Sequence, residues 1–64
     1  MKISVNGAQT EVRAETLEAV IEELGYGEAR VATAVNEAFV PATARDVALS
    51  PGDRVEIVAP RQGG

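Results

Sequence analysis

The sequence contains no cysteine and no histidine among its 64 residues. Their absence removes thiol nucleophiles, imidazole bases and the usual zinc ligands together. It also removes disulfides and Cys/His metal sites, which commonly support a chain this short. We therefore expect one domain that is stabilised by apolar burial and secondary structure, and we do not expect an autonomous enzyme.

Long apolar runs and an excess of positive charge are missing as well. No run approaches the roughly 20 residues of a membrane span, and the start M-K-I-S-V-N-G lacks the apolar core of a signal peptide. Ten acidic residues outnumber six basic ones, a net charge of −4, whereas nucleic-acid affinity comes mostly from Lys and Arg. We expect a cytoplasmic protein that binds neither nucleic acid nor a membrane.

The first part of the chain predicts a hairpin and then a helix. Alternating polarity in residues 1–5 and 10–14 predicts two strands, and Asn6–Gly7 between them is a strong signal for a two-residue turn. Thr16 can cap a helix that ends at Gly25, and the Glu-rich side of this helix is expected to face solvent. Its apolar side chains fall at i, i+3, i+4 and i+7: Leu17, Val20, Ile21 and Leu24.

The second part of the chain predicts another hairpin and a final strand. A buried strand over residues 31–35 turns at Asn36–Glu37 into a short edge strand that Pro41 ends, because proline has no N–H to donate. An irregular or single-turn connection leads to S-P-G-D at residues 50–53, which specifies a type II turn. Residues 54–59 alternate as the last strand.

Together these elements predict an α+β domain over residues 1–59. Its mixed sheet has four or five strands, one main helix covers one face, and the other face stays partly open. Residues 60–64 follow without an apolar residue to anchor them, so we expect a flexible tail. The terminal glycines have no Cβ, which would let them thread a narrow channel and expose the carboxylate of Gly64 to attack. We infer a substrate that another protein activates.

A set of motifs runs along the whole chain in a specific order. They are V-N-G in the first hairpin, L-E-A-V-I-E-E-L on the helix, A-V-N-E-A-F-V-P, S-P-G-D-R-V-E-I-V and the terminal Q-G-G. This set resembles the ThiS family, the sulfur carriers of thiamine biosynthesis. The resemblance implies a ubiquitin-like β-grasp fold.

The resemblance also implies the chemistry of the tail. An E1-like adenylyltransferase of the ThiF type would adenylate Gly64 with ATP and Mg²⁺, and the chain itself would bind no cofactor. Sulfur from a cysteine desulfurase or another donor would convert the end to a thiocarboxylate, which a thiazole synthase of the ThiG type would consume. Gly63 would give clearance, and the residues that enter the partner's channel would be Pro60, Arg61 and Gln62.

The resemblance also implies that partners dock on the sheet face away from the helix. Phe39 and Val58, with Ala32 or Ala34, are the candidates for this surface, and ordinary core packing is the alternative for all four.

Three other functions fit the same residues. The carrier could deliver sulfur to molybdopterin, to a cysteine precursor or to tRNA. It could be a ubiquitin-like modifier that is joined to lysines of other proteins. It could also be a non-covalent β-grasp interaction domain with an incidental tail.

Overall fold

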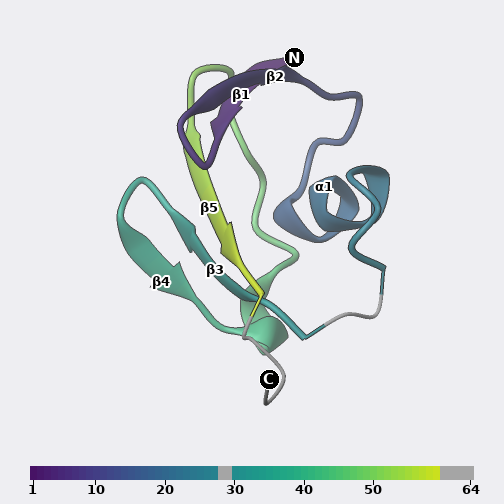
Figure 1. The fold of residues 1–64 in the computed structure, drawn as a ribbon, viewed down its shortest axis with the longest axis vertical. Coiled ribbons are helices and arrows are strands. Elements are labelled where there is room, and N and C mark those ends of the chain that lie inside the picture. The colour runs from purple at the N-terminus through teal and green to yellow at the C-terminus, as the bar shows by residue number, and fades with distance from the viewer. Residues whose placement is uncertain (28–29, 60–64) are drawn as a thin grey trace.

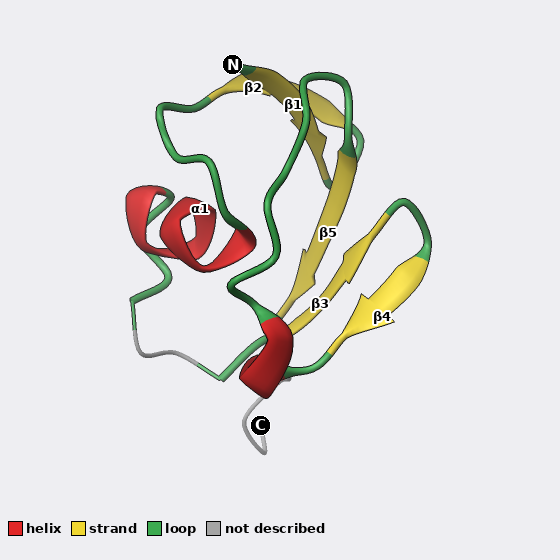
Figure 2. Cartoon of the chain, turned by 180° about the vertical axis from the view of Figure 1, so that it is seen from behind, coloured by secondary structure: helices red, strands yellow, loops and turns green. Residues whose placement is uncertain are grey.

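The computed structural model describes residues 1–27 and 30–59, which form a five-stranded sheet with an α-helix against one face (Figures 1 and 2). The strand order is β2-β1-β5-β3-β4. The β1–β5 pair is parallel and the other pairs are antiparallel, which confirms the predicted mixed sheet. In chain order the elements are β1 (Lys2–Val5), β2 (Ala8–Glu11), α1 (Leu17–Glu23), β3 (Ala32–Val35), β4 (Ala38–Val40), the 3-10 helix η1 (Ala42–Ala44) and β5 (Arg54–Val58).

The two hairpins close with the same kind of turn. Asn6 and Gly7 have φ of 52° and 85°, and Asn36 and Glu37 have φ of 50° and 72°. Positive φ at two successive residues is the type I′ geometry, whose twist matches that of the flanking strands. Asparagine tolerates this conformation well, and both predicted turns are confirmed. The predicted position of the second strand, residues 10–14, is wrong: β2 is Ala8–Glu11, because the two-residue turn lets pairing start at once with Ala8 opposite Val5.

Helix α1 begins and ends at the predicted capping residues. The Oγ1 of Thr16 accepts a hydrogen bond from the N–H of Ala19 at 3.2 Å. At the other end Gly25 has φ of 90°, and the N–H of Tyr26 donates to the carbonyl of Ile21 at 3.1 Å. This is the Schellman arrangement, which satisfies carbonyls that the helix leaves free.

The hydrophobic core lies between α1 and one face of the sheet. Leu17 and Val20 of the helix are fully buried, as the apolar spacing predicts. Burial of each such side chain contributes about 1.5–3 kcal/mol. The buried apolar residues come from β1, α1, β5 and the segments that follow β2 and precede β5: Ile3, Val12, Leu17, Val20, Ile21, Leu49, Val55 and Ile57.

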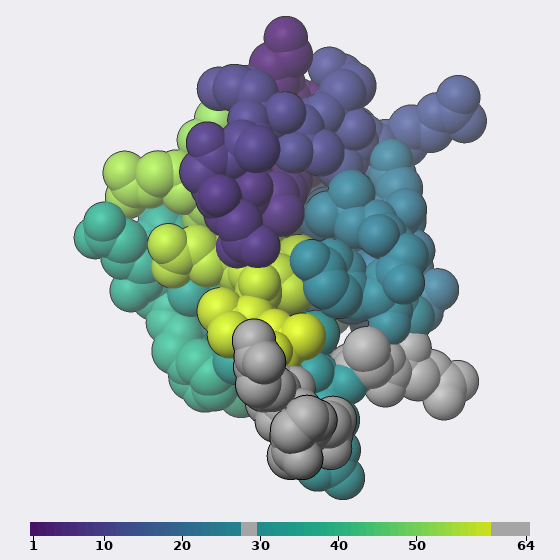
Figure 3. Space-filling view, in the orientation of Figure 1, coloured from purple at the N-terminus to yellow at the C-terminus, as the bar shows by residue number. Residues whose placement is uncertain are grey.

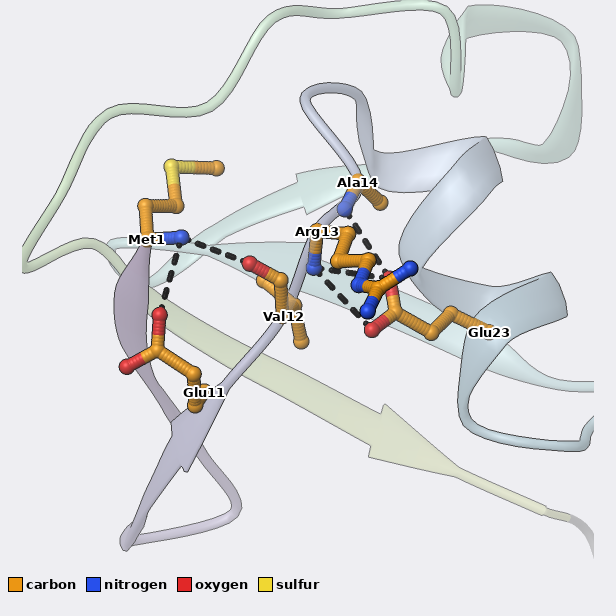
Figure 4. A network of polar contacts seen from close by, with 6 residues as sticks. All are labelled: Met1, Glu11, Val12, Arg13, Ala14 and Glu23. Carbon is orange, nitrogen blue, oxygen red and sulfur yellow. Dashed lines mark hydrogen bonds and ion pairs between the residues drawn. The ribbon is translucent and has the colours of Figure 1, made fainter.

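The Glu-rich side of α1 departs from the expectation that it only faces solvent. Glu18 and Glu22 are exposed, but the two carboxylate oxygens of Glu23 both accept from the N–H of Arg13 at 3.0 Å (Figure 4). One of these oxygens also accepts from the N–H of Ala14 at 2.9 Å. These backbone hydrogen bonds lower the pKa of Glu23. The carboxylate thus fastens the end of α1 to the segment after β2.

Candidate functional site

The residues expected to react or to enter a partner's channel lie outside the part of the chain that the structure describes. They are Pro60, Arg61, Gln62, Gly63 and Gly64. The structure does describe the strand that leads into them, β5, together with the surface beside it and the contacts that keep the strand in the sheet.

Strand β5 lies in the middle of the sheet and is paired unequally along its two edges. Antiparallel pairing with β3 continues as far as Val58, which lies opposite Ala32. Parallel pairing with β1 reaches only to Val55, which lies opposite Val5. In Figure 3 the yellow atoms of β5 lie at the surface between the purple β1–β2 hairpin and the green-teal β3–β4 hairpin. The end of β5 is therefore held by β3 but has passed the end of β1.

The Asn6 side chain continues the hydrogen bonding to β5 beyond the end of β1. Its backbone N–H donates to the carbonyl of Val55 at 2.9 Å. Its Nδ2 then donates to the carbonyl of Ile57 at 3.0 Å, and the N–H of Ile57 donates to its Oδ1 at 2.9 Å. A carboxamide has the same donor and acceptor as a peptide group, so Asn6 pairs with Ile57 as another strand residue would.

Asn36 makes the corresponding contact at the other edge and the other end of β5. Its backbone N–H donates to the carbonyl of Arg54 at 2.7 Å, and the N–H of Arg54 donates to its Oδ1 at 2.9 Å. Its Nδ2 donates to Asp53 at 3.1 Å. Asp53 also accepts from the N–H of Ser50 at 2.8 Å, and these two bonds, with Ser50 the stronger influence, lower the pKa of Asp53. Both asparagines thus bind β5.

Sequence reasoning assigned Asn6 and Asn36 only to their turns. A signal for more was present, because the pattern Val-Asn-x-Ala occurs in both hairpins, at residues 5–8 and 35–38. The turn itself requires only a residue that adopts positive φ, and glycine would do this equally well. Asparagine at both positions therefore indicates that its side-chain amide makes hydrogen bonds.

A polar cluster around Thr33 holds the sheet at the same end as Val58. Thr33 is 2% exposed, and its hydroxyl donates to the carbonyl of Val40 at 2.7 Å. The guanidinium of Arg45 donates from Nε to the Thr33 hydroxyl at 3.1 Å and from Nη2 to the carbonyl of Val31 at 2.5 Å. These bonds satisfy backbone groups near the ends of β3 and β4. Nothing in the sequence pattern pointed to Arg45.

The predicted docking residues lie together on the sheet face away from α1. Phe39 is 71% exposed and Val58 is 62% exposed, so core packing does not describe either residue. Ala34 lies opposite Phe39, and Ala32 lies opposite Val58, so the four share one face. We call Ala32, Ala34, Phe39 and Val58 the open-face patch.

Charged side chains border the open-face patch. Arg54 and Glu56 alternate with the buried residues of β5, which places them on the same face as Val58. An exposed ion pair joins Arg54 Nη2 to Glu37 Oε2 at 3.8 Å. An apolar centre with a charged rim is the usual composition of a protein–protein contact surface.

Acidic side chains do not gather into a metal site anywhere in residues 1–27 and 30–59. Neither helix in that part of the chain is long and apolar enough to cross a membrane. What the described surface offers is the open-face patch beside the strand that leads into the tail, an arrangement suited to contact with another protein.

Known proteins share both this sequence and this fold. The ThiS family model matches residues 3–64. A sulfur carrier protein ThiS from Thermus thermophilus is 41% identical over 61 residues, which are 94% of this chain and 95% of the relative. A crystal structure of a thiamine biosynthesis protein (ThiS) from Geobacter metallireducens matches with a TM-score of 0.81 and 28% identity over 100% of both chains. The chain therefore belongs to the ThiS family.

Proposed function

We propose that this chain is a sulfur carrier of thiamine biosynthesis and that Gly64 carries the sulfur. The observation that carries the proposal is the family match, which extends over residues 3–64 and so includes the terminal glycines. The relatives are named as a sulfur carrier and as a thiamine biosynthesis protein, in agreement with it.

The proposed reaction needs the carboxylate of Gly64 and an enzyme that activates it. A ThiF-type adenylyltransferase joins the carboxylate to the α-phosphate of ATP, with Mg²⁺ and release of pyrophosphate. The terminal sulfur of a cysteine desulfurase persulfide then attacks the adenylate and releases AMP, and a thiol reductant cleaves the resulting acyl disulfide to the thiocarboxylate; a sulfide donor would displace AMP and give the thiocarboxylate directly. A ThiG-type thiazole synthase consumes the thiocarboxylate. The chain is a protein co-substrate in this scheme, and it binds no cofactor of its own. Because the activating enzyme uses ATP, we expect this reaction to take place in the cytoplasm.

The described surface supports docking of these partners. Phe39 and Val58 are the large apolar residues of the open-face patch, and Val58 is the last residue of β5. A partner that covers this patch would be placed beside the chain as it continues into Pro60, Arg61 and Gln62. Gly63 then gives the clearance that a narrow channel requires, since glycine has no Cβ.

Intact mass measurement tests the modification directly. We expect incubation with a ThiF-type enzyme, ATP, Mg²⁺ and a sulfur source to raise the mass by the difference between one sulfur and one oxygen atom. Two controls are a chain that lacks Gly64 and a chain with one alanine appended, both of which should keep the circular dichroism of the wild type and show no shift. No shift for the wild type, under conditions that thiolate a known carrier, refutes the proposal.

Cell-based experiments separate the proposed acceptor from the others. The chain should restore growth without thiamine in a strain that lacks its thiazole sulfur carrier. Failure despite good expression would favour molybdopterin, a cysteine precursor or tRNA as the acceptor. Conjugates of higher mass that depend on Gly64 and resist reducing agents would instead identify a ubiquitin-like modifier.

A further inference from the structure

The amides of Asn6 and Asn36 hold β5 at opposite edges but at different distances from the tail. Asn36 binds Arg54, the first residue of β5, and Asn6 binds Ile57, which only Val58 and Ala59 separate from residues 60–64. On the β1 edge, strand pairing ends at Val55. In the described part of the chain, the Asn6 amide therefore makes the last hydrogen bonds to this edge of β5.

We propose that Asn6 is a positioning residue for the chemistry of the C-terminal tail. This inference rests on the proposed function of Gly64. Pairing with β3 holds one edge of β5 through Val58, and Asn6 holds the other edge at Ile57. A strand that is paired along both edges has a defined twist, whereas a strand end that is paired along one edge frays more readily. Asn6 thus fixes the second edge of β5 close to the point where the strand ends.

The consequence for activation follows from the cost of ordering a backbone. If Asn6 cannot bind Ile57, only pairing with β3 holds the end of β5, and the extra freedom of this segment must be lost when the partner docks. Ordering the backbone of one residue on docking lowers the apparent association constant by about fivefold or more. The effect should appear in KM, because the reacting carboxylate and the enzyme's groups are unchanged.

Glycine variants of the two asparagines form a matched pair. Asn6 and Asn36 have φ of 52° and 50°, which glycine adopts without strain. Asn6→Gly and Asn36→Gly each keep the type I′ turn and each remove one amide from β5. A purely structural role predicts similar losses of stability and equal activation. The positioning role predicts a difference in activation only.

Adenylation kinetics with a ThiF-type enzyme, measured as pyrophosphate release below the melting temperature of both variants, tests the proposal. For Asn6→Gly we expect kcat/KM to fall about fivefold or more through KM. For Asn36→Gly we expect kcat/KM within about twofold of the wild type. The variant Asn6→Asp keeps an acceptor for the N–H of Ile57 but no donor for its carbonyl, so it should fall between the wild type and Asn6→Gly.

Amide hydrogen exchange followed by NMR provides a readout without any partner. We expect the N–H of Ile57 to exchange faster in Asn6→Gly, when its rate is compared with that of amides that exchange only on global unfolding. In Asn36→Gly the same N–H should keep its protection. Equal kcat/KM for the two glycine variants would overturn the positioning role, as would unchanged protection of Ile57 in Asn6→Gly. Failure of the wild type to be adenylated would refute the proposed function instead, which keeps the two failures distinct.

Discussion

Replacement of Phe39 by threonine tests whether the open-face patch is the docking surface. Phe39 lies on the edge strand β4 with 71% of its surface exposed, so it contributes little to the core. Threonine suits a strand, and a substitution at such an exposed position changes stability by about 0.5 kcal/mol or less. The change therefore removes apolar surface from the patch and leaves the fold intact.

The size of the expected effect follows from the exposed fraction. Complete burial of a phenylalanine side chain is worth about 1.5–3 kcal/mol. With 71% of that surface still open to a partner, its coverage is worth about 1–2 kcal/mol. Loss of this contact corresponds to an increase in Kd of about fivefold to thirtyfold.

Isothermal titration calorimetry with a ThiF-type enzyme measures this effect. Val47→Thr is the matched control, because Val47 is also an exposed apolar residue at 41% but lies in the segment whose backbone bonds to the start of α1. We expect Val47→Thr to keep the wild-type Kd. Equal Kd values for Phe39→Thr and the wild type would refute the docking surface. If Phe39→Thr lowered the free energy of unfolding by more than about 1 kcal/mol, the inference that exposed Phe39 contributes little to the core would be wrong.

Three further predictions concern the polar contacts that hold the fold. Thr33→Val leaves the carbonyl of Val40 without its hydroxyl donor and should lower the free energy of unfolding in urea by about 1–3 kcal/mol; an unchanged midpoint would contradict this. Thr16→Ala removes the cap of α1 and should cost about 1 kcal/mol in the same assay, whereas Thr16→Ser should cost much less. The lowered pKa of Glu23 means that its contribution is present above its ordinary value of 4.5 and is lost as pH falls through the folded-state value. The stability difference between the wild type and Glu23→Gln should therefore shrink in acid, and a difference that is constant from neutral pH to pH values well below that range would refute the role of the carboxylate.

Local features of the fold could be predicted because they depend on neighbouring residues. The turn at Asn6–Gly7, the cap at Thr16 and the helix end at Gly25 each follow from the conformational preference of one or two residues. The two faces of each strand follow from alternation. The proposal for Gly64 also comes from the sequence alone, because the role proposed for this glycine is chemical and depends on no neighbour in the fold.

Contacts between distant segments could be decided only by the tertiary structure. Asn6 and Ile57 are 51 positions apart, and nothing near either residue specifies that they pair. The same holds for Glu23 with Arg13 and for Arg45, whose guanidinium reaches Val31 across the end of the sheet.

The open-face patch depends partly on the sequence pattern and partly on the tertiary structure. Alternation places Phe39 and Val58 on one face of their strands, but it does not say which face a helix covers. That choice is made by the strand order and by where α1 packs, and both are properties of the whole chain. Sequence by itself thus determined the type and order of the elements and the turns and caps between them. The folded arrangement decided which side chains hold β5 and which remain exposed, because only packing brings distant residues together.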